Sequence, residues 1–190
     1  MIALGFRVKS GYAVAVAVRG PASEPSAVAR RVVELSDPNV AGTRQPFHHD
    51  LFTHETDARA LDERVQVVKA CAKRAVAALL EDEPFSNERC RSAALVVGSV
   101  IDPAHVGNPH IRAHASEGQL FREVLRDALE SHGVACDVVV EKDLAARAAA
   151  GLHRRDGEIR SVVAHFGRQV GGPWRADEKA ASTAAWMMLR

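Results

Sequence analysis

Metal-ligand and acidic residue types are densest in one stretch of the chain, FHHDLFTHE, at residues 47–55. The group consists of His48, His49, Asp50, His54 and Glu55. Imidazole and carboxylate groups ligate metals, and histidines can also hold a phosphate. His49 and His54 are five residues apart, whereas two zinc-binding histidines on one helix face are four apart. Because the chain has nine histidines, we interpret the stretch as a polar surface loop, with a metal or phosphate site as the alternative.

Three more histidines lie in the segment DPAHVGNPHIRAH, which follows the apolar run AALVVGSVI. They are His105, His110 and His114. In an α/β sheet, the loop after a buried strand is a usual place for a ligand. That position makes them ligand candidates, but we interpret them as solvated loop residues.

Other patterns exclude several enzyme classes. Cys71, Cys90 and Cys136 are far apart and have no CxxC spacing, which argues against a disulfide framework or a cysteine zinc site. The glycine-rich segment GRQVGGPWRADEK could cradle a phosphate at a helix start, but it has neither the GxxxxGK[ST] nor the GxGxxG spacing. No GxSxG nucleophile elbow is present.

The composition favours one soluble α/β domain spanning residues 1–190. The chain has 25 basic and 24 acidic residues, for a net charge of +1, which leaves no bulk electrostatic footprint for nucleic acid. A local basic patch is compatible with this balance. No signal-peptide pattern and no membrane-spanning run are found, so we expect a cytoplasmic protein without membrane contact.

The elements that would position these residues begin with three predicted strands, at residues 2–7, 12–18 and 28–35. Ser10-Gly11 joins the first two as a hairpin. The third, SAVARRVVEL, also fits a helix. The first three strands can pair as an antiparallel meander.

The second half alternates helices and strands, which implies parallel strands joined by right-handed crossovers. Thr56 is the predicted N-cap of a first long helix, and residues 93–101 are a strand buried on both faces. The remaining predicted elements are a helix at 116–132, a strand at VACDVVVE, a helix at 143–152, a strand or strand–helix junction at 159–166, and a helix at 177–189.

This order of elements resembles the ribonuclease-H-like superfamily, and within it the Holliday-junction-resolvase branch. IALGFRVKSGYAVAVAV resembles the family's opening xxGIDPGxxxxGxAV hairpin, AALVVGSV its central strand, and ADEKAASTAAWMML its closing helix. The resemblance implies a mixed sheet with an antiparallel opening meander and parallel later strands, flanked by helices.

The family's activity requires two metal ions held by carboxylates, which activate water and stabilise the leaving oxygen of a phosphodiester. The first-strand acid falls on Arg7, the central-strand acid at or beside Gly98, and the closing-helix acid near Ser182. None of these residues is acidic, and a guanidinium repels Mg²⁺ instead of ligating it. The resemblance therefore implies an active site that has lost two-metal catalysis.

The sequence thus favours a non-catalytic binding or scaffold protein with a degenerate cleft, no cofactor and no metal, for which a homodimer is one candidate assembly. The expected cleft residues are Arg7, Lys9, Asp102, Glu141, Asp177 and Ser182. Arg7 would pair there with an acid or face an anion such as a nucleic-acid backbone. The alternative is a metal-dependent nucleic-acid hydrolase with relocated carboxylates at Asp102, Glu141 and Asp177. An actin-like kinase or ATPase lobe also shares the opening hairpin, but 190 residues hold only one of the two lobes it needs.

Overall fold

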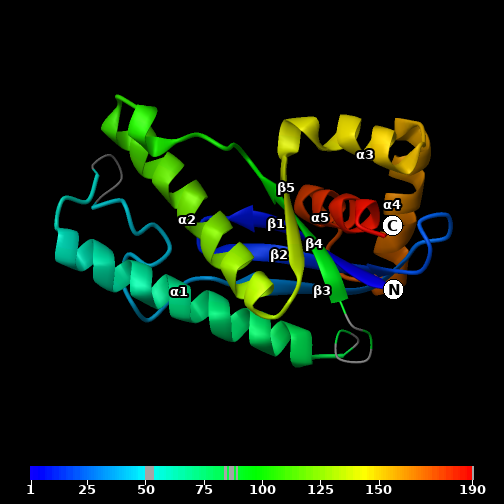
Figure 1. Ribbon diagram of the computed structural model, residues 1–190, viewed down its shortest axis with the longest axis horizontal. Helices are drawn as coiled ribbons and strands as arrows, with labels where there is room; N and C mark the ends of the chain where they lie inside the picture. The colour runs from blue at the N-terminus through cyan, green and yellow to red at the C-terminus, as the bar shows by residue number, and fades with distance from the viewer. Residues whose placement is uncertain (50–53, 84, 86–87, 89, 190) are drawn as a thin grey trace.

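The computed structural model describes residues 1–49, 54–83, 85, 88 and 90–189. At its centre is a five-stranded sheet in the order β3-β2-β1-β4-β5 (Figure 1). The strands are β1 (Ile2–Lys9), β2 (Tyr12–Arg19), β3 (Ser26–Glu34), β4 (Cys90–Val97) and β5 (Ala135–Val140).

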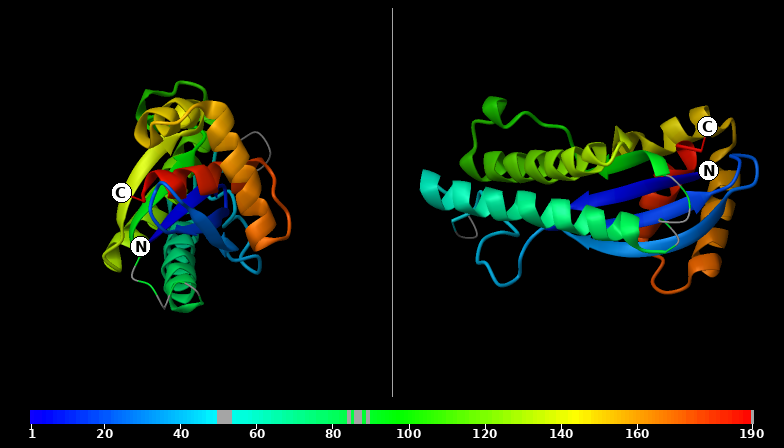
Figure 2. Two further views of the ribbon diagram at one scale, coloured as in Figure 1. Left: turned by 90° about the vertical axis from the view of Figure 1, so that its right-hand side faces the viewer. Right: turned by 60° about the horizontal axis from the view of Figure 1, so that its bottom comes forward.

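Two groups of helices cover the two faces of this sheet (Figure 2). The helices are α1 (Ala58–Glu81), α2 (Pro109–Ser131), α3 (Leu144–Leu152), α4 (Asp156–Val170) and α5 (Ala176–Met187), with short 3₁₀ turns η1 (Pro103–His105) and η2 (Glu141–Asp143). Helices α1 and α2 pack on one face, and α3, α4 and α5 on the other. None of the helices in the described ranges combines the length and apolar character of a membrane-spanning segment.

The predicted hairpin and central strand are confirmed. β1 pairs antiparallel with β2, Lys9 standing opposite Tyr12, and parallel with β4. The segment that also fitted a helix is strand β3, paired antiparallel with β2. β1 and β4 are apolar on nearly every residue because helices cover both of their faces. The result is the predicted α/β fold with a mixed sheet.

Two helix starts differ from the sequence prediction. Asp57, not Thr56, caps α1, because its carboxylate accepts hydrogen bonds from backbone N–H groups of the first turn. Helix α2 begins well before the predicted start at Ser116, since Asn108 caps it and Pro109 occupies its first position. His110 therefore lies on a helix and not in a loop, as does His114.

The segment predicted as a strand or strand–helix junction, residues 159–166, lies inside helix α4. Its apolar side chains do not form a continuous buried run. Ile159, Val163 and Phe166 are buried at spacings of four and three, while the residues between them face outward to differing degrees. That period belongs to an amphipathic helix, so the prediction was wrong.

Helix α5 crosses β1 at very close range above Gly5. A Cβ atom at this position would collide with the carbonyl oxygen of Ala181 and would lie 2.6 Å from the backbone nitrogen of Ala185. The facing side of α5 is built of alanines, which brings the helix backbone down onto the strand. Gly5 thus sets the distance between the sheet and its last helix.

We expect Gly5→Ala to destabilise the fold by about 3 kcal/mol, the upper part of the usual cost of overpacking, because backbone atoms must move. Urea unfolding followed by circular dichroism measures this change. Gly98→Ala is the matched control, since a Cβ there would meet no atom within 4 Å. Equal stability of the two variants would contradict the close-packing argument.

Candidate functional sites

Arg7 lies near the end of β1, on the face of the sheet that α5 covers, and its side chain is only 6 % exposed. Its Nη1 donates to the carbonyl oxygens of Val8 at 3.0 Å and Val96 at 3.4 Å. Its Nη2 donates to Oε2 of Glu141 at 2.5 Å. Because Glu141 directly follows β5, the guanidinium ties together the ends of three strands, β1, β4 and β5.

A second acid reaches the same arginine from α5. Oδ1 of Asp177, in the first turn of that helix, lies 3.8 Å from Nε of Arg7 and 3.2 Å from Nζ of Lys9. The cluster therefore contains two cations and two carboxylates, with no net charge. We call these four residues the Arg7 cluster.

A pocket of about 210 Å³ lies between the ends of β1 and β4 and helix α2. Arg7 and Lys9 line it from β1, Gly98 from the end of β4, and His114 from α2. Gly98, at or beside which the resemblance places the central-strand acid, thus lines the same pocket as Arg7. Because it is a glycine, it offers no carboxylate there.

Two of the expected cleft residues are engaged elsewhere. The Asp102 carboxylate caps η1 by accepting from the backbone N–H of Ala104 at 2.9 Å and contacts His105 at 2.8 Å. Those two interactions lower the pKa of Asp102. Ser182 is buried within α5, where its hydroxyl donates to the carbonyl of Lys179. The three acids of the hydrolase alternative are therefore not brought onto one ion-pair network.

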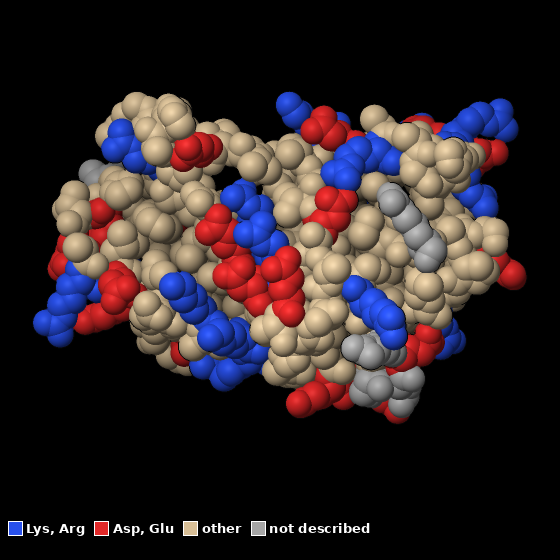
Figure 3. Space-filling model, viewed as in Figure 1, with Lys and Arg blue, Asp and Glu red and all other residues tan. Residues whose placement is uncertain are grey.

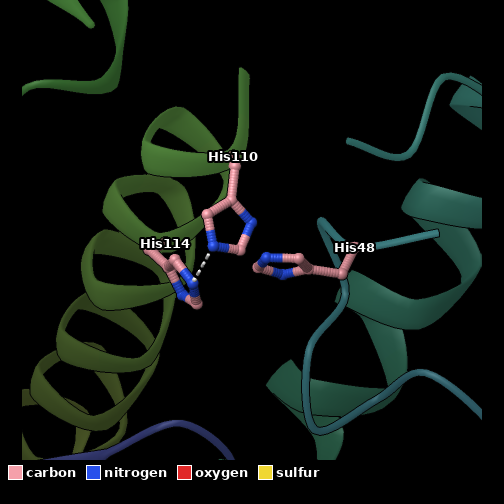
Figure 4. Close-up of side chains that lie close together, drawn as sticks. All are labelled: His48, His110 and His114. Carbon is pink, nitrogen blue, oxygen red and sulfur yellow. Dashed lines mark hydrogen bonds between the residues drawn. The ribbon is translucent and has the colours of Figure 1, made fainter. Parts of the chain in front are cut away.

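Histidines from both candidate segments meet outside the Arg7 cluster. One ring nitrogen from each of His48, His110 and His114 lies within 4.8 Å of the other two. Figure 4 shows the three rings turned toward one another, His48 from the loop and the other two from α2. We call these residues the histidine cluster.

The other ligand candidates do not join it. His49 is 68 % exposed, with Nδ1 3.5 Å from Oε2 of Glu55, while Nδ1 of His54 contacts the Glu55 carbonyl. His105 is directed to Asp102. Asp50 lies outside the described residues. Each of the two histidine-containing segments thus places only some of its histidines in the histidine cluster.

Sequence reasoning missed Glu117, which is buried beside the histidine cluster. Its Oε1 lies 2.6 Å from Nδ1 of His48, and its Oε2 lies 3.7 Å from Nδ1 of His114. Burial raises the pKa of the Glu117 carboxyl, against the lowering effect of the His48 hydrogen bond. Burial and the charges of the two neighbouring histidines lower the pKa of His114. The Asn-Pro helix start was the available signal, because it places Glu117 on one helix face with His110 and His114.

The loop carrying His48 is held by Arg64 of α1. Nη1 of Arg64 donates to the carbonyls of Pro46 at 3.1 Å and His48 at 3.3 Å, and it pairs with Oε2 of Glu55 at 3.0 Å. Glu55 is buried and also accepts from the backbone N–H of Thr56. The backbone of His48 is therefore fixed independently of its own ring.

We expect Arg7→Ala to destabilise the protein by about 1–3 kcal/mol, because Glu141 and Asp177 lose the cation they share. Both acids are partly exposed, so the value stays below that of a fully buried pair. Urea unfolding measures it, and adding Glu141→Gln should recover part of the loss. In the control Arg59→Ala, which breaks an exposed pair with Glu63, the change should stay below about 0.5 kcal/mol. An Arg7→Ala protein as stable as the control would refute the structural role of the cluster.

Solved structures with the same arrangement of elements exist, although no family model and no curated protein sequence matches the chain. RuvC of Thermus thermophilus, solved in complex with a Holliday junction substrate, superposes with a TM-score of 0.58 at 13 % identity, covering 98 % of this chain and 91 % of that one. A second Thermus thermophilus RuvC structure gives a TM-score of 0.55 at 12 % identity, covering 98 % and 92 %. The chain therefore has the ribonuclease-H-like fold, in the form found in RuvC.

Proposed function

We propose that this chain is a non-catalytic binding or scaffold protein, in which an ion-pair cluster replaces the metal-binding carboxylates of a resolvase-type active site. The observation that carries the proposal is Arg7, a buried guanidinium on the opening strand, bonded to Glu141. A guanidinium stays charged at every working pH. By the sequence resemblance, Arg7 stands at the first-strand position where two-metal hydrolysis requires an anionic ligand.

The charge balance of the Arg7 cluster argues against binding of either a metal ion or a phosphate there. Glu141 and Asp177, the two acids of this cluster, are already neutralised by Arg7 and Lys9. A divalent cation would have to displace an arginine from its carboxylates, and a phosphate would have to displace a carboxylate from its cations. Neither ligand finds an uncompensated charge in this cluster.

The charge on the face of the molecule drawn in Figure 3 agrees with a partner other than nucleic acid. One of the similar structures named above is RuvC in complex with a Holliday junction substrate. Proteins that bind duplexes usually present a basic stripe or patch to the phosphates. In the view of Figure 3, however, basic side chains lie in small groups beside acidic ones over α1, α2 and β5, and the net charge is +1. A homodimer remains a candidate assembly for a scaffold of this kind.

The alternative, a nucleic-acid hydrolase with relocated carboxylates, has one observation in its favour. Glu141 and Asp177 lie within ion-pair distance of the same guanidinium, so two carboxylates already flank one position. The third acid is missing from this group, because Asp102 lines a different pocket, together with Phe47 and Lys69. A single cation held by two carboxylates that share an arginine is a weaker basis for phosphodiester hydrolysis than a two-metal site.

We expect the purified chain not to cleave four-way DNA junctions or duplex DNA in Mg²⁺ or Mn²⁺, under conditions in which a Holliday-junction resolvase completes the reaction. Gel electrophoresis of end-labelled substrates measures cleavage. Glu141→Gln and Asp177→Asn are the matched variants. Metal-dependent cleavage by the chain that either variant abolishes would overturn the proposal and favour the relocated carboxylates.

A further inference from the structure

We propose that His48, His110 and His114 form a binding site for a divalent transition-metal ion of the zinc class. The site lies where the N-terminal part of α2 meets the loop that precedes α1 (Figure 4). It uses none of the carboxylates of the Arg7 cluster, although His114 also lines the pocket that Arg7 and Lys9 line.

The spacing of the ring nitrogens fits such an ion. Nε2 of His110 and Nε2 of His114 are 3.2 Å apart. Zn–N bonds of about 2.0–2.1 Å hold the nitrogens of a tetrahedral site about 3.3 Å apart. The two residues are four apart on α2, the spacing that puts two metal ligands on one helix face. The two rings are within hydrogen-bond distance of each other, and that separation is also the one that a zinc ion would require.

His48 supplies the third nitrogen. Its side chain is 6 % exposed and its ring points toward the other two histidines (Figure 4). Nδ1 lies 2.6 Å from Glu117, but Nε2 is buried and has no hydrogen-bond partner among the described residues. A buried polar atom left without a partner is costly, and a metal ion would satisfy it.

Glu117 is placed as the positioning residue of this site. Metal-binding histidines usually donate their second ring N–H to a carboxylate, which fixes the tautomer and the ring orientation. The buried Glu117 carboxylate lies against Nδ1 of His48 and 3.7 Å from Nδ1 of His114. Donation from Nδ1 leaves the lone pair on Nε2, the atom that faces the cluster.

The donor set selects the class of metal. Three imidazole nitrogens suit Zn²⁺, Co²⁺, Ni²⁺ and Cu²⁺, whereas Mg²⁺ and Ca²⁺ require oxygen ligands. Three protein ligands leave a fourth tetrahedral position for water or a ligand group. The ion would also join the loop to α2, in addition to the contacts that Arg64 makes with the His48 backbone.

The test is metal binding by the untagged, chelator-treated full chain. We expect isothermal titration calorimetry to give one Zn²⁺ per chain and no heat with Mg²⁺. Zn²⁺ should raise the melting temperature, because it binds the folded state. Co²⁺ should produce the visible absorption of a tetrahedral nitrogen site. His110→Ala and His114→Ala, whose side chains are not fully buried, should abolish the Co²⁺ absorption and weaken Zn²⁺ binding at least about 100-fold.

Two further variants separate ligation from general effects. His105→Ala removes a histidine of the same segment that is 84 % exposed and paired with Asp102, and it should bind Zn²⁺ like the parent chain. Glu117→Gln should keep the Co²⁺ absorption and weaken Zn²⁺ binding about 10–100-fold. The proposal is overturned if the full chain binds no Zn²⁺. It is equally overturned if a His110→Ala/His114→Ala chain with native circular dichroism binds Zn²⁺ as tightly as the parent.

Discussion

The close contact between α5 and β1 is the constraint on which the rest of this structure depends. A glycine on the strand and alanines on the helix allow the two backbones to touch. At that distance, the first turn of α5 brings Asp177 to the end of β1, within reach of Arg7 and Lys9. A bulkier contact would lift the helix and separate the charges. The ion pairs therefore depend on the small residues at this contact as well as on the charged residues themselves.

The two candidate sites lie in neighbouring parts of the fold but are built from different interactions. In the Arg7 cluster, the buried Arg7, the partly exposed Lys9 and two partly exposed acids cancel in charge, and the ends of three strands are held together. In the histidine cluster, imidazole rings lie together, and two of them stand beside one buried carboxylate. His114 connects the two places, because it lines the same pocket as Arg7 while its ring belongs to the cluster. One end of the sheet thus combines a charge-balanced ion-pair cluster with a group of imidazole side chains.

Local patterns predicted the sheet well, because alternation and continuous apolar runs depend on neighbours in the sequence. They failed at α4, where residues 159–166 were predicted as a strand or a strand–helix junction although the buried residues follow a helical period. The pairing of Arg7 with Glu141 was accessible, since both stand at strand ends on one edge of the sheet. The histidine cluster was not, because His48 meets His110 only through the packing of a loop on α2. Glu117 was not connected with His110 and His114, because the helix was predicted to begin at Ser116, after both histidines.

The parallel pairing of β1 with β4 also determines how this chain can fold. Gly5 on β1 is in register with Ala94 on β4, so the centre of the sheet joins segments that are separated in the sequence by β2, β3 and the whole of α1. Contacts of such long sequence separation slow folding, because the chain entropy is lost before the contact is gained. During synthesis the meander β1–β3 can pair early, whereas the face of β1 that α5 covers stays open until the last helix has been made. A chain in which α5 has not yet docked exposes the apolar side chains that this helix covers on β1 and β4, where other chains can associate with them.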